Sequence, residues 1–95
     1  LNYNGTIYID NGAAKALSNG KSLLAAGITK INGNFKKGEN VIILDQNNNQ
    51  LARGLSSFSS VEIDKIKGKQ SREIETILGY LSKTEVIHKD DMVLL

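Results

Sequence analysis

The alternation of apolar and polar residues near the start of the chain predicts a strand followed directly by a short helix. In GTIYID, Ile7 and Ile9 alternate with Thr and Tyr, which is the period-two pattern of a strand with one buried face. Asp10 or Asn11 is expected to cap the helix GAAKAL. Because the Ser-Asn-Gly sequence at residues 18–20 favours a left-handed stop, this helix should have only about two turns.

The middle of the chain predicts further extended segments separated by turns. SLLAAGITKI is expected to be extended, and Asn-Gly at residues 32–33 is typical of a tight turn. A second turn at residues 37–39 precedes NVIILD, whose apolar run at residues 41–44 predicts burial on both faces. After a polar hairpin loop at residues 46–50, LARGLSS returns as the partner strand, in which Gly54 indicates a bulge or a close backbone approach.

The second half of the chain predicts two helices and a strand-forming end. Ser59 and Glu62 match a Ser-x-x-Glu capping box, so a helix should begin there, cover VEIDKIKG and end at Gly68. Ser71 is expected to cap the next helix. EVIHKDDMVLL predicts two short strands around an acidic turn. The apolar residues of the second helix recur at i, i+3, i+4 and i+7 and should share one face: Ile74, Ile77, Leu78 and Leu81.

Length and composition indicate one small, mainly β domain that spans residues 1–95. The chain has 95 residues, of which 40% are hydrophobic and only 5% aromatic, so its core should be aliphatic. A folded chain of this size can bury about 64% of its surface, which is enough for a modest core. It begins at Leu1 rather than Met, which indicates a piece of a longer protein.

The residue types that are absent narrow the possible chemistry and location. With no cysteine, the chain can form no disulfide, thiolate zinc site or cysteine nucleophile, as expected in a reducing compartment. Neither a signal peptide nor an apolar run of about 18 residues is present. We therefore expect a cytoplasmic protein without a membrane partner.

Three short motifs suggest chemistry, but each fits a structural role better. Gly20-Lys21-Ser22 resembles the end of a phosphate-binding loop, yet a helix precedes it, whereas a strand should precede and a helix follow such a loop. The polar loop that begins at Asp45 matches only the first three ligand positions of a calcium-binding EF-hand. His88 stands alone beside two turn-forming carboxylates. We predict no catalytic, cofactor-binding or metal-binding residue in this chain.

The net charge of +2 is too small to imply nucleic acid by itself, but the charge is unevenly distributed. Residues 1–60 contain six basic and three acidic residues, whereas residues 61–95 contain six and seven. The basic residues at positions 65–72 are accompanied by acids on both sides, at positions 62, 64, 73 and 75, and such mixed charge is typical of a solvated helical face. The first part of the chain is the more favourable region for an anionic partner.

Several separate stretches together resemble one family, the C-terminal PUA domain of bacterial glutamate 5-kinases. The similar stretches are GTIYIDNGAAKAL, GKSLLAAGITKINGNFKKGENVIILD and LARGLSSFSSVEIDKIKGKQSREIETILGY. The closing VIHKDDMVLL resembles the histidine-basic-aspartate ending of that family. The resemblance covers essentially the whole chain. It departs from the family at Lys89 and Asp91, where Arg and Asn are common, which leaves this edge less basic.

The resemblance implies both a fold and a parent enzyme. The fold is a mixed β pseudo-barrel of five to six strands with two or three short helices. The parent enzyme uses ATP and Mg²⁺ to phosphorylate L-glutamate to L-glutamyl 5-phosphate, which opens proline biosynthesis. Its kinase domain would lie N-terminal to Leu1 in the same chain, and the parent could form a homo-oligomer. Neither ATP nor Mg²⁺ is expected to bind this fragment.

The resemblance leaves three functions open. The domain could regulate or support the kinase through domain contacts, it could bind RNA, or it could belong to an RNA-modifying enzyme, since a fold does not determine a function. RNA binding by PUA domains uses the first short helix and the strand after it. In this chain that surface comprises Gly12, Ala13, Lys15, Lys21 and Ser22.

Overall fold

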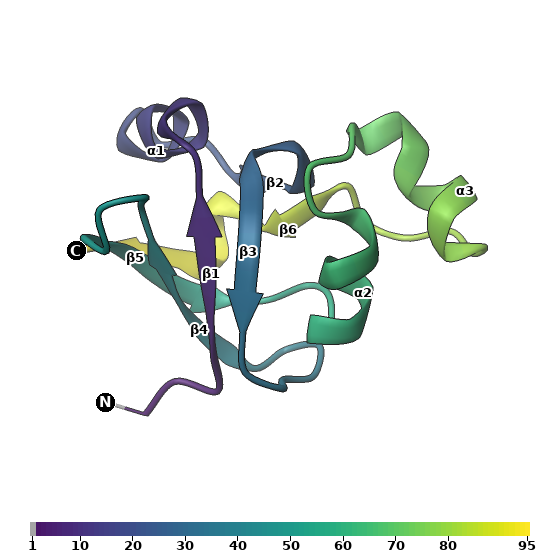
Figure 1. The fold of residues 1–95 in the computed structure, drawn as a ribbon, viewed down its shortest axis with the longest axis horizontal. Helices are drawn as coiled ribbons and strands as arrows, with labels where there is room; N and C mark the ends of the chain where they lie inside the picture. The colour runs from purple at the N-terminus through teal and green to yellow at the C-terminus, as the bar shows by residue number, and fades with distance from the viewer. Residues whose placement is uncertain (1) are drawn as a thin grey trace.

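The computed structural model describes residues 2–95 and contains a five-stranded mixed sheet and a separate pair of short strands (Figure 1). The order in the large sheet is β3-β1-β4-β5-β7, with β1 parallel to β4 and every other neighbouring pair antiparallel. The second sheet pairs β2 with β6 in antiparallel orientation. The strands are β1 Gly5–Ile9, β2 Leu23–Leu24, β3 Ile28–Asn32, β4 Asn40–Leu44, β5 Gln50–Leu55, β6 Glu85–Ile87 and β7 Met92–Leu94.

The predicted mixed β fold is confirmed, and the aliphatic core follows from the strand pattern. Ile7 and Ile9 of β1 are fully buried, as their alternation predicts. In β4, the central strand of the large sheet, residues 41–43 are all buried, and because successive side chains point to opposite faces, both faces of this strand are covered. Phe35 and Phe58 are the aromatic side chains in this core. Among residues 2–95, no helix is long and apolar enough to cross a membrane. Leu1 lies outside the described residues.

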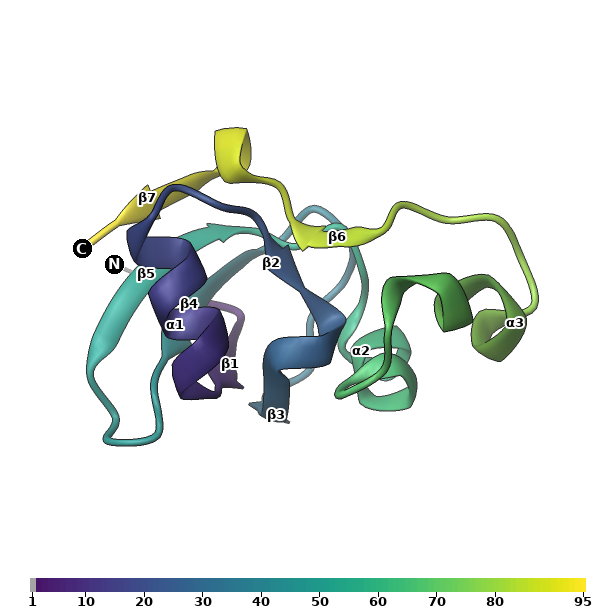
Figure 2. The same ribbon diagram turned by 90° about the horizontal axis from the view of Figure 1, so that it is seen from above.

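The first two helices begin where the sequence predicts. In α1 (Asn11–Ser18), the Asp10 carboxylate accepts a hydrogen bond of 2.8 Å from the backbone N–H of Ala13. In α2 (Ser60–Ile66), the Ser59 hydroxyl accepts from the Glu62 N–H and the Glu62 carboxylate accepts from the Ser59 N–H, which completes the predicted capping box. Figures 1 and 2 show α1 beside β2, and α2 beside β3.

The third helix differs from the prediction. A 3₁₀ turn at Ser71–Glu73 precedes α3 (Ile74–Leu78), and Gln70 rather than Ser71 forms the cap. Gly79 has a φ of 83° and ends the helix, so the face predicted from apolar spacing is cut short. Ile74 is buried, whereas Leu81 is 83% exposed. The helix lies at the end of the molecule opposite β5 (Figures 1 and 2).

Long-range contacts interrupt the extended segment that was expected after α1. A 3₁₀ turn at Ala25–Gly27 separates β2 from β3, and the backbone carbonyl of Ala25 accepts hydrogen bonds from the N–H of Ile28 within the turn and from the distant N–H of Gly68. The predicted close approach at Gly54 is confirmed, since a Cβ there would lie 2.6 Å from the carbonyl oxygen of Asp91. The two predicted C-terminal strands both form, but they belong to different sheets, since β6 pairs with β2 and β7 pairs with β5.

Candidate functional site

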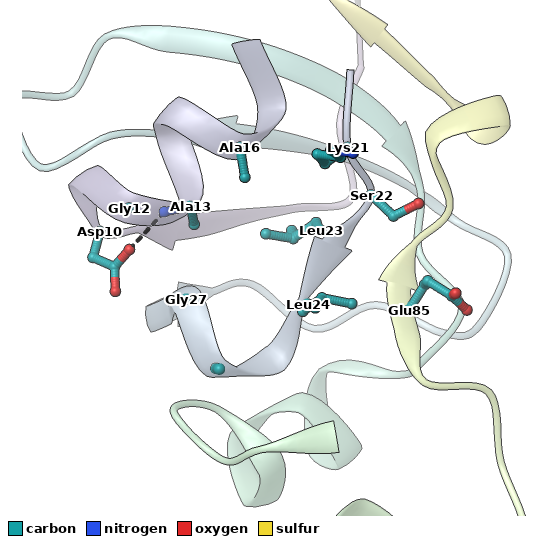
Figure 3. Close-up of a pocket in the computed structure, with 11 residues that line it drawn as sticks. Asp10, Gly12, Ala13, Ala16, Lys21, Ser22, Leu23, Leu24, Gly27 and Glu85 are labelled. Atoms are coloured by element: carbon teal, nitrogen blue, oxygen red, sulfur yellow. Dashed lines mark hydrogen bonds between the residues drawn. The ribbon is translucent and has the colours of Figure 1, made fainter. Parts of the chain in front are cut away.

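A pocket of about 540 Å³ lies between the first helix, β2 with the turn that follows it, and β6 (Figure 3). Its volume falls within the range of small-ligand sites in proteins. Most of its lining is apolar. The lining residues are Asp10, Gly12, Ala13, Ala16, Lys21, Ser22, Leu23, Leu24, Ala26, Gly27 and Glu85.

One side of the pocket depends on a close approach between α1 and the 3₁₀ turn. A Cβ on Gly27 would lie only 2.4 Å from the Cβ of Ala13, so the two backbones can approach only because residue 27 is glycine. The Asp10 N–H donates to the carbonyl of Gly27 at 2.9 Å and ties the start of α1 to this turn. The side chain of Asp10 also caps α1, so this one residue positions both the helix and the turn on this side of the pocket.

The other side of the pocket is formed by β2 and β6. Leu24 pairs with Glu85 in the antiparallel register, which brings two residues that are distant in sequence to the same wall. The Ser22 hydroxyl accepts a hydrogen bond of 2.8 Å from the backbone N–H of Lys89 and holds the segment after β6 against β2. In Figure 3, Ser22 and Glu85 lie across the pocket from Asp10.

The residues proposed from sequence as an RNA surface are partly brought together. Gly12, Ala13, Lys21 and Ser22 all line the pocket, whereas Lys15 is exposed and lies outside its lining. Their role in binding stays a prediction. Sequence reasoning missed Glu85, which gives the pocket a carboxylate that no local pattern around residue 85 reveals. Asp10 was identified only as a helix cap.

The motifs interpreted as structural have structural contacts. Gly20 has a φ of 78° and follows the end of α1, so Lys21 and Ser22 do not open a helix as a phosphate-binding loop would. The Asp45 carboxylate accepts hydrogen bonds from the side chain and backbone of Asn49 and from the backbone of Asn47, which lower its pKa. The predicted hairpin loop between β4 and β5 is confirmed.

His88 and the Lys67–Asp64 pair also make local contacts. His88 Nδ1 accepts a hydrogen bond from the N–H of Asp90 and caps the 3₁₀ turn at Lys89–Asp91. Lys67 forms an ion pair of 2.5 Å with Asp64 on α2, as expected for a solvated helical face. Within residues 2–95, no three His, Asp or Glu side chains gather in a way that could hold a metal ion.

A tyrosine and a carboxylate link the segment after α3 to α2. The Tyr80 hydroxyl donates a hydrogen bond to the Glu62 carboxylate, which raises the pKa of Tyr80. Burial alone would raise the pKa of Glu62, but hydrogen bonds from Tyr80 and Ser59 outweigh it and lower that pKa. Glu62 therefore stabilises two structural junctions, the helix cap and the Tyr80 contact.

Comparison with known proteins assigns the family. The sequence model of the PUA domain family matches residues 5–78 of this chain, from β1 to the end of α3. The chain belongs to the PUA domain family. Among solved structures, one similar fold is that of a PUA domain protein from Aeropyrum pernix K1, solved as a tartrate complex. Its TM-score is 0.67 at 21% identity, and the match covers 90% of this chain and 41% of the Aeropyrum chain. A chain of an H/ACA RNP bound to a substrate RNA has a TM-score of 0.64 at 21% identity, and the match covers 88% of this chain and 22% of the RNP chain.

Several similar curated sequences are glutamate 5-kinases. That of Pelagibacter ubique is 65% identical over 89 residues, which is 94% of this chain and 24% of the relative. That of Zymomonas mobilis is 48% identical over 95 residues, which is 100% of this chain and 24% of the relative. The PUA chain thus spans about a quarter of the length of these curated relatives.

Proposed function

We propose that this chain is the PUA part of a glutamate 5-kinase and acts as its non-catalytic regulatory or structural domain. The observation that carries the proposal is the identity of 65% with the Pelagibacter ubique glutamate 5-kinase over 94% of the chain. The RNA-bound H/ACA structure shares the fold at only 21% identity. In this proposal the parent enzyme is cytoplasmic, and the kinase domain of the same chain is the principal partner.

The parent reaction would transfer the γ-phosphoryl group of ATP, with Mg²⁺, to the side-chain carboxylate of L-glutamate. The residues of this domain do not fit those cofactors. Lys21 and Ser22 follow the C-terminal end of α1 and so lack the amides of a helix N-terminus to hold phosphate. Phosphoryl transfer is therefore assigned to the rest of the parent protein.

A truncation of the full-length parent enzyme tests this proposal. The complete protein is compared with a form that ends before Gly5, in magnesium dependence, in inhibition by proline and in oligomer size. We expect the truncated enzyme to phosphorylate glutamate but to differ in at least one of these three properties. Identical behaviour in all three would refute a regulatory or structural role.

RNA binding is the second candidate, and one observation favours it. Four residues of the predicted RNA surface, Gly12, Ala13, Lys21 and Ser22, gather at one pocket in a fold that an RNA-bound H/ACA structure shares. Glycine permits close backbone approach and lysine neutralises phosphate. The affinity for structured RNA should then fall steeply as salt rises. Retention on RNA no greater than that of a neutral control protein at low salt would exclude this function.

A further inference from the structure

Two opposite charges lie at the pocket without pairing with each other. Lys21 and Glu85 both line it, yet no ion pair within 4.0 Å joins them in the described part of the chain. Neither the Lys21 ammonium nor the Glu85 carboxylate makes a side-chain hydrogen bond to another group of residues 2–95. Glu85 is half-buried, and Figure 3 shows its carboxylate on the β6 side of the pocket. Both groups are available to a ligand.

Between these charges the pocket is apolar. Leu23 and Leu24 form one side and Ala13 and Ala16 of α1 the other. Leu24 is 43% exposed although it lies in a hollow, so a bound aliphatic group would remove its side chain from water. A pocket of about 540 Å³ with an apolar lining and a few polar groups is suited to a small molecule.

The charge of the lining selects the kind of ligand. Asp10 and Glu85 contribute two carboxylates against one ammonium from Lys21. A phosphate-rich ligand would meet repulsion from both acids, whereas a ligand that carries an ammonium and a carboxylate finds a partner for each. Ser22 adds a donor, because its oxygen accepts from the Lys89 N–H and its own hydrogen stays free to point elsewhere.

We propose that this pocket binds a zwitterion with an aliphatic side chain, of the size of an amino acid. The ligand carboxylate contacts Lys21 and Ser22, its ammonium contacts Glu85, and its side chain packs on the exposed Leu24 and against α1. This inference goes beyond the proposed role in the kinase and does not depend on it, because it concerns binding by the 95-residue chain alone. The core of that chain is formed within residues 7–87.

Three ligands that differ in one charge at a time test the proposal. L-Leucine carries both charges, 4-methylpentanoate lacks the ammonium, and 3-methylbutylamine lacks the carboxylate. Each is titrated into the ¹⁵N-labelled chain, and amide shifts are followed by NMR. We expect L-leucine to bind about threefold to tenfold more tightly than either analogue, since each lost charge removes one charge-assisted hydrogen bond at a partly exposed site. The shifts should cluster at Lys21, Ser22, Leu24 and Glu85.

Single variants locate the two charges. Glu85→Gln keeps the shape of the side chain and should weaken L-leucine about threefold to tenfold without weakening 4-methylpentanoate, whose carboxylate Glu85 repels. Lys21→Gln should weaken L-leucine without weakening 3-methylbutylamine, whose ammonium Lys21 repels. Lys15→Gln is the matched control, because Lys15 is a neighbouring lysine outside the lining, and it should change nothing. Unchanged ¹⁵N spectra away from the pocket show that each variant is folded.

The same variants separate this proposal from RNA binding. If the pocket is an RNA surface, Glu85→Gln removes a repulsive charge and tightens RNA binding, while L-leucine produces no saturable shifts. That result overturns the zwitterion proposal. It is equally overturned if 4-methylpentanoate or 3-methylbutylamine binds as tightly as L-leucine, or if Glu85→Gln leaves the affinity for L-leucine unchanged.

Discussion

The close approach of α1 and the 3₁₀ turn at Ala25–Gly27 allows the loss of stability in a Gly27 variant to be predicted. In Gly27→Ala, the new methyl group would lie 2.4 Å from the Cβ of Ala13, whereas carbon atoms in contact are normally about 3.5–4.0 Å apart. The helix and the turn must therefore separate by more than about 1 Å. Such overpacking typically costs about 1–3 kcal/mol, so we expect the free energy of unfolding to fall by that amount.

A second substitution can isolate this contact. Ala13→Gly removes the Cβ that the new methyl group would meet, and by itself it costs up to about 1 kcal/mol through lost helix propensity. In the double variant Gly27→Ala/Ala13→Gly, the clash is absent, so the two losses should not add. The double variant should be more stable than the sum of the two single losses by about 1–2 kcal/mol.

Urea denaturation followed by circular dichroism measures all four members of this cycle. Gly12→Ala serves as the control, because a Cβ there lies 3.5 Å from a carboxylate oxygen of Asp10, which is ordinary contact. It should be neutral or stabilising by up to about 1 kcal/mol. A loss below about 0.5 kcal/mol in Gly27→Ala, or strict additivity in the double variant, would refute the inferred contact.

Three further substitutions test the rest of the fold. Gly54→Ala should reduce the free energy of unfolding by about 2–3 kcal/mol in urea denaturation, since its methyl group would lie 2.6 Å from the backbone oxygen of Asp91; a wild-type midpoint contradicts this. Ser59→Ala should cost about 1 kcal/mol in thermal unfolding, because it removes one bond of the capping box, and a melting temperature equal to that of the parent argues against the cap. Tyr80→Phe removes a hydrogen bond that lowers the pKa of Glu62 below its usual value of 4.5. The contribution of this bond to the free energy of unfolding is therefore present above about pH 4.5 and is lost as the pH falls through the folded-state pKa of Glu62. The stability difference between parent and Tyr80→Phe should therefore shrink from pH 7 to pH 3, and a difference independent of pH would count against the ionised Glu62 contact.

The features that the sequence predicted correctly depend on residues close together in the chain. The capping box joins Ser59 to Glu62, three residues apart, and both hydrogen bonds form as the spacing predicts. The Asp10 cap is equally local. The strand at residues 5–9 was evident from alternation, because successive side chains point to opposite faces of the sheet, of which one packs in the core and the other is partly exposed.

The features that were missed or wrong depend on partners far away in sequence or on a competing local signal. The parallel pairing of β1 with β4 is set by packing of the whole sheet, and a single-strand pattern carries no information about it. In α3, the apolar spacing extended to Leu81, but Gly79 ended the helix first. The side-chain spacing was genuine, and the backbone preference of one glycine outweighed it.

Glu85 shows why the candidate site itself was only partly predictable. Its place at the pocket depends on the register that pairs Leu24 with Glu85. Because side chains alternate along a strand, a shift of one residue would turn Glu85 away from the pocket and bring the buried Val86 to its wall. The hydrogen bonds from the N–H of Lys89 to Ser22 and from the N–H of Ser57 to the carbonyl of Val86 hold that register.

One of the three charged residues at the pocket, Glu85, lies in a segment that the PUA family model does not match. That match ends at residue 78, before β6, whereas the alignment with the Zymomonas mobilis glutamate 5-kinase extends over the whole chain. The residues expected to face an anion lie within the family match, in α1 and in the segment that leads to β2. The wall formed by β6 contributes the opposing carboxylate. If Glu85 governs binding as proposed, the ligand preference of this pocket depends on the part of the chain that extends beyond the common PUA segment.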